Sequence, residues 1–302
     1  MTRYSLAVST LALVGALTLS ASDAVAQTPS ADPQGGPVGT AGTTPPPAAT
    51  QANDDPAALD PLEPDYALVN LPTTLRLPKG GGNFHLTHRF NDDLIKGDAG
   101  DHFSNLFGLD NGANIGLEFR YGLARNLQGI VQRTSISKAV QLSVKYDAVH
   151  ENADKPVSVS AIISIEGQNN FHNSDQGDAN FAPSLGLVLS RKLGTSAIVF
   201  AEPFWVHNTG VESDTRDTVF VGLGARLRLG ATANLVGEVS PRVGGVAVLG
   251  DPLYGFAIEK RVGAHVFSLT FTNRAATTFR QIAQGGTPDN LNLGFNLTRK
   301  FF

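Results

Sequence analysis

The sequence contains no cysteine, which excludes every kind of site that depends on a thiol. A chain of 302 residues without cysteine has no disulfide framework, no cysteine-ligated zinc or iron–sulfur cluster and no thiol nucleophile. It also lacks the residue that is acylated in a lipoprotein. Charged residues are scarce as well, at 17% of the chain, compared with roughly 25% in typical soluble domains. The composition therefore argues against an ordinary soluble surface.

The sequence also lacks the patterns that mark common enzymes and nucleic-acid-binding proteins. It has no basic run, and its formal net charge is −4, so we predict no nucleic-acid partner. Neither G-x-S-x-G, H-E-x-x-H nor a phosphate-binding loop occurs. His85 and His88 are three residues apart, which would place them on opposite faces of a strand. We predict no catalytic residue, metal or cofactor, and no enzyme.

The first 26 residues form a predicted signal peptide. Arg3 is followed by an apolar stretch over residues 6–19 and then by Ala24-Val25-Ala26, the small-x-small pattern that precedes signal-peptidase cleavage. The apolar stretch is about 14 residues long, whereas a membrane-spanning helix needs roughly 20. We therefore expect a mature chain that starts at Gln27.

Residues 27–70 form a predicted flexible leader, rich in Pro and Ala and acidic. No Lys or Arg occurs between Arg3 and Arg76, and such a segment has too little apolar surface to offset the entropy of ordering it. Two interpretations are open: the leader is an inert spacer, or its acidic residues enter or cap a basic lumen. The short piece 73–78 is expected to pair weakly or to fold into a barrel mouth.

Residues 71–302 show the two-residue alternation of β-strands. In one segment Ile115, Leu117 and Phe119 alternate with Glu118 and Arg120, so that one face is apolar and the other polar. Most segments have eight to thirteen residues, close to the 9–11 that a membrane barrel strand needs. The alternation predicts twelve strands, over residues 83–90, 114–123, 127–135, 138–147, 155–166, 181–192, 196–207, 218–229, 234–243, 254–260, 264–273 and 290–302.

The connections between these segments alternate between long and short, which is typical of outer-membrane barrels. Long connections are predicted at 91–113, 167–180, 208–217, 244–253 and 274–289. The polar faces carry Gly, Ser, Asn and Thr rather than the Lys and Glu of a surface in water. We predict an all-β fold: a transmembrane, antiparallel, up-and-down β-barrel of about twelve strands, surrounded by the lipid of the bacterial outer membrane.

The last segment has the features of a barrel assembly signal. It alternates, contains a glycine and an aromatic residue, and ends on phenylalanine, as does the terminal strand that the outer-membrane assembly machinery recognises. We therefore expect that machinery to bind the C-terminal strand. The residues assigned to the signal are Gly294, Phe295, Leu297, Phe301 and Phe302.

Several stretches together resemble the bacterial β-barrel family DUF5777. The resemblance extends over roughly residues 71–302 and implies a membrane-bound barrel, but it supplies no substrate and no functional residues. The stretches are 88–90, 106–115, 121–123, 202–208, 222–224 and 293–299.

Nine charged residues are expected to line the lumen, because an Arg or Lys that faced lipid at the bilayer midplane would cost roughly 2–4 kcal/mol. They could form ion pairs that hold a narrow barrel together, or a charged constriction that selects solutes. Six are basic and three acidic, which favours small anionic solutes. The nine residues are Arg89, Glu118, Arg120, Lys145, Glu166, Arg226, Arg228, Glu238 and Arg242. Glu202 is left open, because both faces of its strand are apolar.

Three functions are open, and the first is favoured: a narrow passive pore or small-solute channel. The second is a closed barrel with a structural or docking role. The third is a membrane-embedded hydrolase that uses His207 and Asn208 with Ser190 or Ser268, although no spacing supports it. Loop 91–113 is too apolar for a free loop, and we expect it to fold inward and constrict the barrel.

Overall fold

The computed structural model describes residues 60–172, 180–210, 217–245 and 251–301. The signal peptide and the first part of the leader lie outside the described residues. The strands are β1 (Gly82–Phe90), β2 (Ala113–Ala124), β3 (Leu127–Thr134), β4 (Val140–Val149), β5 (Ser158–Gly167), β6 (Phe181–Leu193), β7 (Ala197–Val206), β8 (Thr218–Arg228), β9 (Ala233–Ser240), β10 (Arg242–Gly245), β11 (Leu253–Val262), β12 (His265–Thr272) and β13 (Asn292–Phe301).

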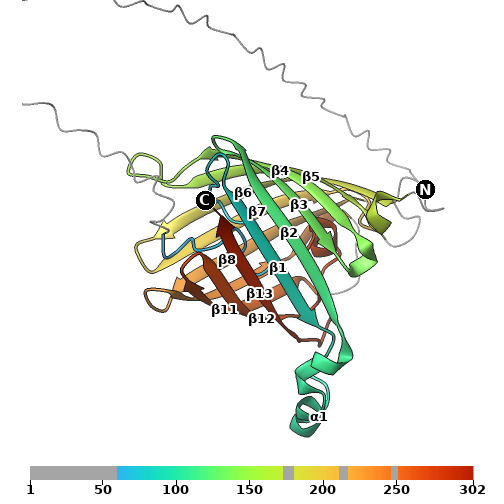
Figure 1. The fold of residues 1–302 in the computed structure, drawn as a ribbon. Helices are drawn as coiled ribbons and strands as arrows, with labels where there is room; N and C mark the ends of the chain where they lie inside the picture. Colours follow the sequence, from blue (N-terminus) through green and yellow to red (C-terminus); the bar gives the residue numbers. More distant parts are fainter. Residues whose placement is uncertain (1–59, 173–179, 211–216, 246–250, 302) are drawn as a thin grey trace, which may run out of the picture. The chain divides into compact units, whose positions relative to one another are not determined.

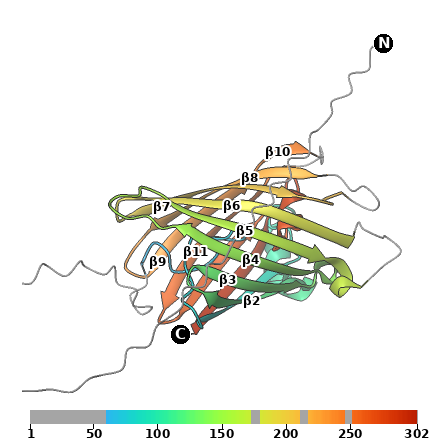
Figure 2. The same ribbon diagram turned by 90° about the horizontal axis from the view of Figure 1, so that it is seen from above.

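The strands form one closed antiparallel ring (Figures 1 and 2). From β1 to β9 each strand pairs with the next in sequence, β9 pairs with β11, β11 with β12, β12 with β13, and β13 with β1. β9 and β10 are one strand interrupted at Pro241, since β10 continues along the same neighbour, β8, in the same register as far as Arg242. Proline has no main-chain N–H to donate to a ladder, which accounts for the break. The prediction of a twelve-stranded up-and-down barrel is confirmed.

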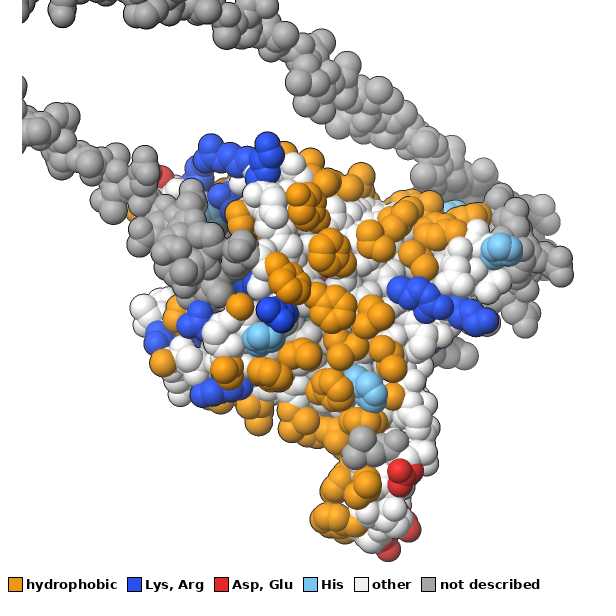
Figure 3. Space-filling view, in the orientation of Figure 1, with side chains coloured by type: hydrophobic (Ala, Val, Ile, Leu, Met, Phe, Trp, Pro, Cys, Tyr) orange, Lys and Arg blue, Asp and Glu red, His pale blue; other side chains and the backbone are white. Residues whose placement is uncertain are grey.

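The two faces of the barrel wall differ as the alternation predicts. Outward side chains such as Leu117, Phe119 and Leu269 are exposed, whereas inward polar ones such as Arg120 and Thr270 are buried. Figure 3 shows apolar side chains over the barrel face in that view. A wall that is apolar outside and polar inside is the arrangement of a membrane barrel rather than of a soluble one.

The connections divide the barrel into two ends. Short connections join β2 to β3, β6 to β7, β8 to β9 and β11 to β12; we call this the short-turn end. The longest described connections, β1–β2 and β12–β13, lie at the other end, the long-loop end. Two short helical turns also occur there, η2 (Ile136–Lys138) and η3 (Gln168–Phe171). No helix in the described ranges is long and apolar enough to cross a bilayer.

The β1–β2 loop does not enter the barrel, so the expectation that it constricts the lumen was wrong. It contains α1 (Ala99–Ser104) and η1 (Leu106–Asn111), and α1 projects beyond the strands in Figure 1. Asp98 and Asp101 form a capping box at the start of α1, which has no buried residue. Its Phe103 is 66% exposed. Apolar composition alone did not reveal which way the loop folds.

The lumen is filled by two other segments. The chain from residue 60 to residue 78, which we call the lumenal hairpin, lies inside the barrel, although the sequence analysis assigns residues 60–70 to the flexible leader. The loop between β12 and β13 enters from the long-loop end and carries α2 (Phe279–Ala283), all of whose residues are buried. Leu68 and Leu71 of the hairpin and Phe279 of α2 belong to one buried apolar cluster.

Candidate functional site: a lumen closed by two segments

The lumenal hairpin is a tight reversal of the chain that contributes no strand to the ring. Leu68 donates its main-chain N–H to the carbonyl of Leu71 at 2.8 Å, and Thr73 donates to Tyr66 at 2.9 Å. A single bridge, between Ala67 and Pro72, closes the turn. The tip therefore consists of Val69 and Asn70.

The hairpin tip is held by the carboxylate of Glu238, which projects from β9. Its oxygens accept main-chain N–H bonds from Val69 at 3.0 Å, from Asn70 at 3.0 Å and from Leu71 at 3.1 Å. The side-chain amide of Asn70 adds a further bond at 2.8 Å. A carboxylate suits this position because consecutive N–H groups of a turn all need an acceptor when they are buried.

Two other wall residues bind the carbonyl oxygens near the tip. Arg89 of β1 donates to the Val69 carbonyl at 3.3 Å and to the Asn70 side chain at 3.1 Å. Asn296 of β13 donates to the same Val69 carbonyl at 3.0 Å and accepts from Arg89 at 2.7 Å. The main-chain donors and acceptors of the tip are thus matched by wall residues of the opposite kind.

Arg226 of β8 holds the first arm of the hairpin. It donates to the carbonyls of Ala67 at 2.9 Å and Leu62 at 3.3 Å. Its guanidinium is also paired with Glu259 of β11 at 2.7 Å. The pair fixes the guanidinium in a plane that presents donors to the hairpin, the geometry for which arginine is suited.

Glycines in the wall make room for the apolar side chains of the hairpin. A Cβ added at Gly222 would lie 2.8 Å from Leu71, and one added at Gly224 would collide with Leu68. At Gly255 a Cβ would approach Val69 to 3.2 Å. The inward glycines of β8 thus form niches that the hairpin fills.

The base of the hairpin is attached at the short-turn end. Lys192 at the end of β6 pairs with Asp60 at 2.6 Å and with Glu63 at 3.2 Å. Burial tends to raise the pKa of Asp60, but hydrogen bonds from Lys192 and from the Leu62 main chain outweigh it and hold that pKa below its ordinary value. The hydroxyls of Thr74 and Ser190 lie 2.6 Å apart. These contacts attach both arms of the hairpin to β6.

The return arm is also attached to the neighbouring strands β3 and β4. Lys145 of β4 and Gln128 of β3 both donate to the Leu75 carbonyl, at 2.9 Å and 3.0 Å. Asp147 accepts from both of these side chains. The wall therefore holds this arm through one compact polar cluster.

The β12–β13 loop closes the lumen from the long-loop end. The Phe279 ring stacks on Phe204 of β7 with centroids 4.5 Å apart, and its main-chain N–H donates to Gln141 of β4 at 2.9 Å. Gln132 of β3 donates to the Thr277 carbonyl at 2.7 Å. The apolar inner face of β7, which left the position of Glu202 open in the sequence, is explained by this packing.

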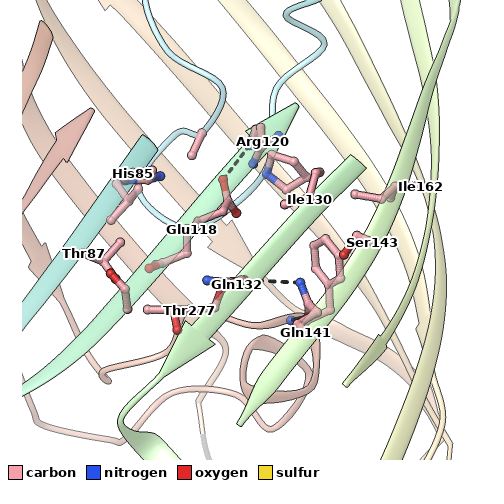
Figure 4. Close-up of a pocket in the computed structure, with 16 residues that line it drawn as sticks. His85, Thr87, Glu118, Arg120, Ile130, Gln132, Gln141, Ser143, Ile162 and Thr277 are labelled. Carbon is pink, nitrogen blue, oxygen red and sulfur yellow. Dashed lines mark hydrogen bonds and ion pairs between the residues drawn. The ribbon is translucent and has the colours of Figure 1, made fainter. Parts of the chain in front are cut away.

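A small cavity is left between the hairpin, the β12–β13 loop and the wall (Figure 4). Glu118 and Arg120 of β2, paired at 2.5 Å, lie on its wall with Gln132 and Gln141. Its volume is about 30 Å³, which is room for one or two water molecules. In the described residues, the hairpin and the β12–β13 loop therefore fill most of this part of the lumen.

Seven of the nine predicted lumen residues lie inside the wall, and two lie at its ends. Arg228 is the last residue of β8 and lies exposed at the rim, where it donates to the Gly230 carbonyl. Arg242 follows the break at Pro241 and is half-buried, donating to the Gln284 carbonyl of the β12–β13 loop. The seven inside are Arg89, Glu118, Arg120, Lys145, Glu166, Arg226 and Glu238.

Four charged wall residues were missed or left open. Asp147, Glu202, Glu259 and Lys300 are all buried on the inner face. Together with the seven residues above, these four give five basic and six acidic side chains, and Lys192 and Arg242, which contact the hairpin and the β12–β13 loop, are two further bases. The signal was present for three of them, because strand parity places Asp147, Glu259 and Lys300 inward. The preference for anionic solutes stays a prediction.

The residues of the predicted assembly signal lie on β13, where it closes the ring against β1. A Cβ at Gly294 would come within 2.8 Å of the Arg89 side chain, so this glycine lets Arg89 cross the strand. Phe295 stacks on His88 with centroids 4.8 Å apart, and Phe301 is exposed. Phe302 lies outside the described residues. Binding to the assembly machinery stays a prediction.

The structure does not bring the residues of the hydrolase alternative together. His207 follows the end of β7 that pairs with Ser184, whereas Ser190 pairs with Phe200 and faces the lumenal hairpin. These two positions of β6 are six residues apart in sequence, which corresponds to roughly 20 Å along a strand. Ser268 is on β12 and is buried inside the wall. His207 pairs instead with Asp217.

Residues 65–301 match the family described as "Membrane bound beta barrel domain (DUF5777)". The chain belongs to this family. The resemblance inferred from the sequence is thereby confirmed, and with it a membrane-bound barrel. The family match begins within the lumenal hairpin, at residue 65.

Solved structures with a similar barrel are outer-membrane proteins. The "NanC porin" is 8% identical with a TM-score of 0.47, over 74% of this chain and 99% of that one. The COG4313 outer membrane channel from Pseudomonas putida F1 is 13% identical with a TM-score of 0.45, over 75% and 97%. Outer membrane phospholipase A from Escherichia coli is 10% identical with a TM-score of 0.42, over 72% and 89%. No curated protein sequence matches the chain.

Proposed function

We propose that this DUF5777 barrel is an outer-membrane channel for small solutes that is held closed by the lumenal hairpin and the β12–β13 loop. The observation that carries the proposal is that neither segment belongs to the ring: residues 60–78 contribute no strand to it. The hairpin can therefore leave through the short-turn end, and the loop can move out of the long-loop end, without breaking any hydrogen bond between neighbouring strands.

The size of the ring and the nature of the contacts support the proposal. Eight strands enclose a space that side chains fill, whereas sixteen or more leave an aqueous channel. Twelve strands lie between these limits, and here two extra segments occupy the inside. Most polar contacts of the hairpin are hydrogen bonds between wall side chains and its main chain, and water can replace each of them.

The absence of cysteine makes a direct test possible. In the mature chain 27–302, Thr74→Cys and Ser190→Cys would place two thiols where hydroxyls lie 2.6 Å apart, so that oxidation locks the hairpin in the lumen. In a planar bilayer we expect the oxidised protein to be silent and the reduced protein to give discrete conductance steps. Each single-cysteine variant is the control, because it conducts in both redox states.

The contrary result is equally clear. If the reduced barrel is inserted but silent, and stays silent when Leu68→Ser and Leu71→Ser empty the glycine niches, the channel proposal fails. The barrel would then have the structural or docking role of the alternative. The reversal potential of the conducting protein shows whether it prefers anions, as the sequence predicts, or cations.

A further inference from the structure

Glu202 is a buried carboxylate without a partner. It lies on the inner face of β7 and is fully buried, and neither of its oxygens has a hydrogen-bond partner among the described residues. Lys145, which interacts with it electrostatically, gives its ammonium group to Asp147 and to the Leu75 carbonyl. Burial of an unpaired carboxylate is unfavourable, so its place in the wall needs a reason.

The position of Glu202 relative to Glu238 suggests that reason. Glu202 pairs across the ladder with Gly222 of β8, and Gly224, two residues further along β8, pairs with Glu238 of β9. The two carboxylates thus lie on either side of a glycine pair, all on the inner face. Leu71 and Leu68 of the hairpin occupy the space above these glycines.

Withdrawal of the hairpin would expose both carboxylates to the lumen. Each hydrogen bond given above for Glu238 comes from residues 69–71, so Glu238 would lose these donors together. The basic wall residues that interact with them keep other partners: Lys145, near Glu202, stays paired with Asp147, and Arg89, near Glu238, stays hydrogen-bonded to Asn296. The two carboxylates beside Gly222 and Gly224 would then need other N–H donors, such as those that the hairpin tip supplies when the barrel is closed.

Resting on the proposed channel function, we infer that Glu202 and Glu238 form a binding site for a cationic group, namely the ammonium group of a small solute in the open lumen. In the closed barrel the main-chain N–H groups of the hairpin tip occupy the Glu238 half of this site. A primary ammonium group has the charge that compensates both carboxylates and donors that replace those N–H groups. This site predicts that the channel takes small solutes that carry an ammonium group.

Binding is measured on the folded mature chain carrying Leu68→Ser and Leu71→Ser, and on a second chain in which a Gly/Ser segment of equal length replaces residues 62–74. The probes are ethylammonium chloride and tetramethylammonium chloride at equal ionic strength, since only ethylammonium has N–H donors. We expect ethylammonium at 100 mM to raise the melting temperature by about 2–5 °C, and more than tetramethylammonium does.

Glu202→Gln should abolish the shift, because it removes the charge without touching any hairpin contact. Glu118→Gln is the matched control on the opposite wall, where Glu118 is paired with Arg120, and it should retain the shift. The inference is overturned if neither chain shows a shift, or if the shift survives Glu202→Gln. If a barrel with the hairpin displaced conducts but does not bind ethylammonium, the binding site is excluded and the channel proposal stands. If it binds ethylammonium but does not conduct, the channel proposal is excluded and the binding site stands.

Discussion

Glu238 and Asn70 are joined by three hydrogen bonds: the main-chain N–H of Asn70 lies 3.0 Å from each carboxylate oxygen, and its side-chain amide lies 2.8 Å from one of them. Asn70 is the point at which the hairpin reverses. One carboxylate on the barrel wall therefore controls how far the leader reaches into the lumen. Loosening this contact is the most direct way to test whether the hairpin is displaceable.

Glu238→Gln should loosen the hairpin tip without unfolding the barrel. Glutamine keeps one acceptor oxygen but loses the one that receives the N–H groups of Val69 and Leu71. A lost hydrogen bond to a buried charged group costs about 1.5–3 kcal/mol, so amide exchange at residues 69–71 should accelerate about tenfold to a hundredfold. Glu118→Gln should leave these rates unchanged. Equal protection in both variants would show that Glu238 does not hold the tip.

Gly224→Ala should displace the hairpin by steric conflict. Its new Cβ would collide with Leu68, and overpacking of this kind costs about 1–3 kcal/mol. Gly237→Ala on the neighbouring strand is the control, since nothing lies within 4 Å of a Cβ there. Amide exchange of the hairpin reads out both variants. The added substitution Leu68→Ala should restore protection, and a failure of that rescue would argue against a niche.

The strands could be predicted from the sequence because their information is local. The alternation of Ile115, Leu117 and Phe119 with Glu118 and Arg120 requires a two-sided wall whatever the rest of the chain does. Parity also holds at the strand ends. Arg228 still pairs with Asn234 and Arg242 with Phe220, so both have the inward parity, but each lies at an end of the barrel rather than deep in the lumen.

The contents of the lumen could not be predicted in the same way. The hairpin has no periodicity, and its prolines make it resemble a linker. Its signal was the density of apolar side chains from Leu62 to Leu71, which a leader in water does not need. Gly222 and Gly224 were recognised as small and inward, but the sequence does not show that Leu71 and Leu68 fill the space. That relationship joins segments about 150 residues apart and exists only in the folded chain.

Deletion of residues 98–110 should leave conductance unchanged. The sequence suggested that this loop narrows the barrel, but α1 has no buried residue and points away from the strands. Single-channel recordings of the deletion variant, made in the reduced Thr74→Cys/Ser190→Cys background described above, check this. A larger step size would show that the loop enters the lumen after all.

Acid should weaken the base of the hairpin through Asp60. Because the docked state lowers the pKa of Asp60, the stabilisation is present above the ordinary value of 3.8 and is lost as the pH falls through the lowered pKa. The effect is small, below about 1 kcal/mol, because the pair is partly exposed. Protection factors for residues 62–74 should differ between wild type and Asp60→Asn at pH 6 and converge below pH 3. A difference that persists at low pH would exclude this ion pair as the cause.

Phe279→Ala should release the β12–β13 loop at the long-loop end while the hairpin stays docked. The ring is buried and stacks on Phe204, and loss of a buried Phe side chain typically costs about 3–5 kcal/mol. Arg280 is 5% exposed in the closed barrel, so trypsin should cut after it slowly in wild type and at least about a hundredfold faster in the variant. Phe103→Ala, on the exposed α1, should leave the rate of cleavage unchanged.

Because the hairpin contacts Glu238, Arg226 and Lys192 independently of Phe279, amide exchange at residues 69–71 should stay as slow as in wild type. Joint release of both segments would instead show that the lumen opens as one cooperative unit.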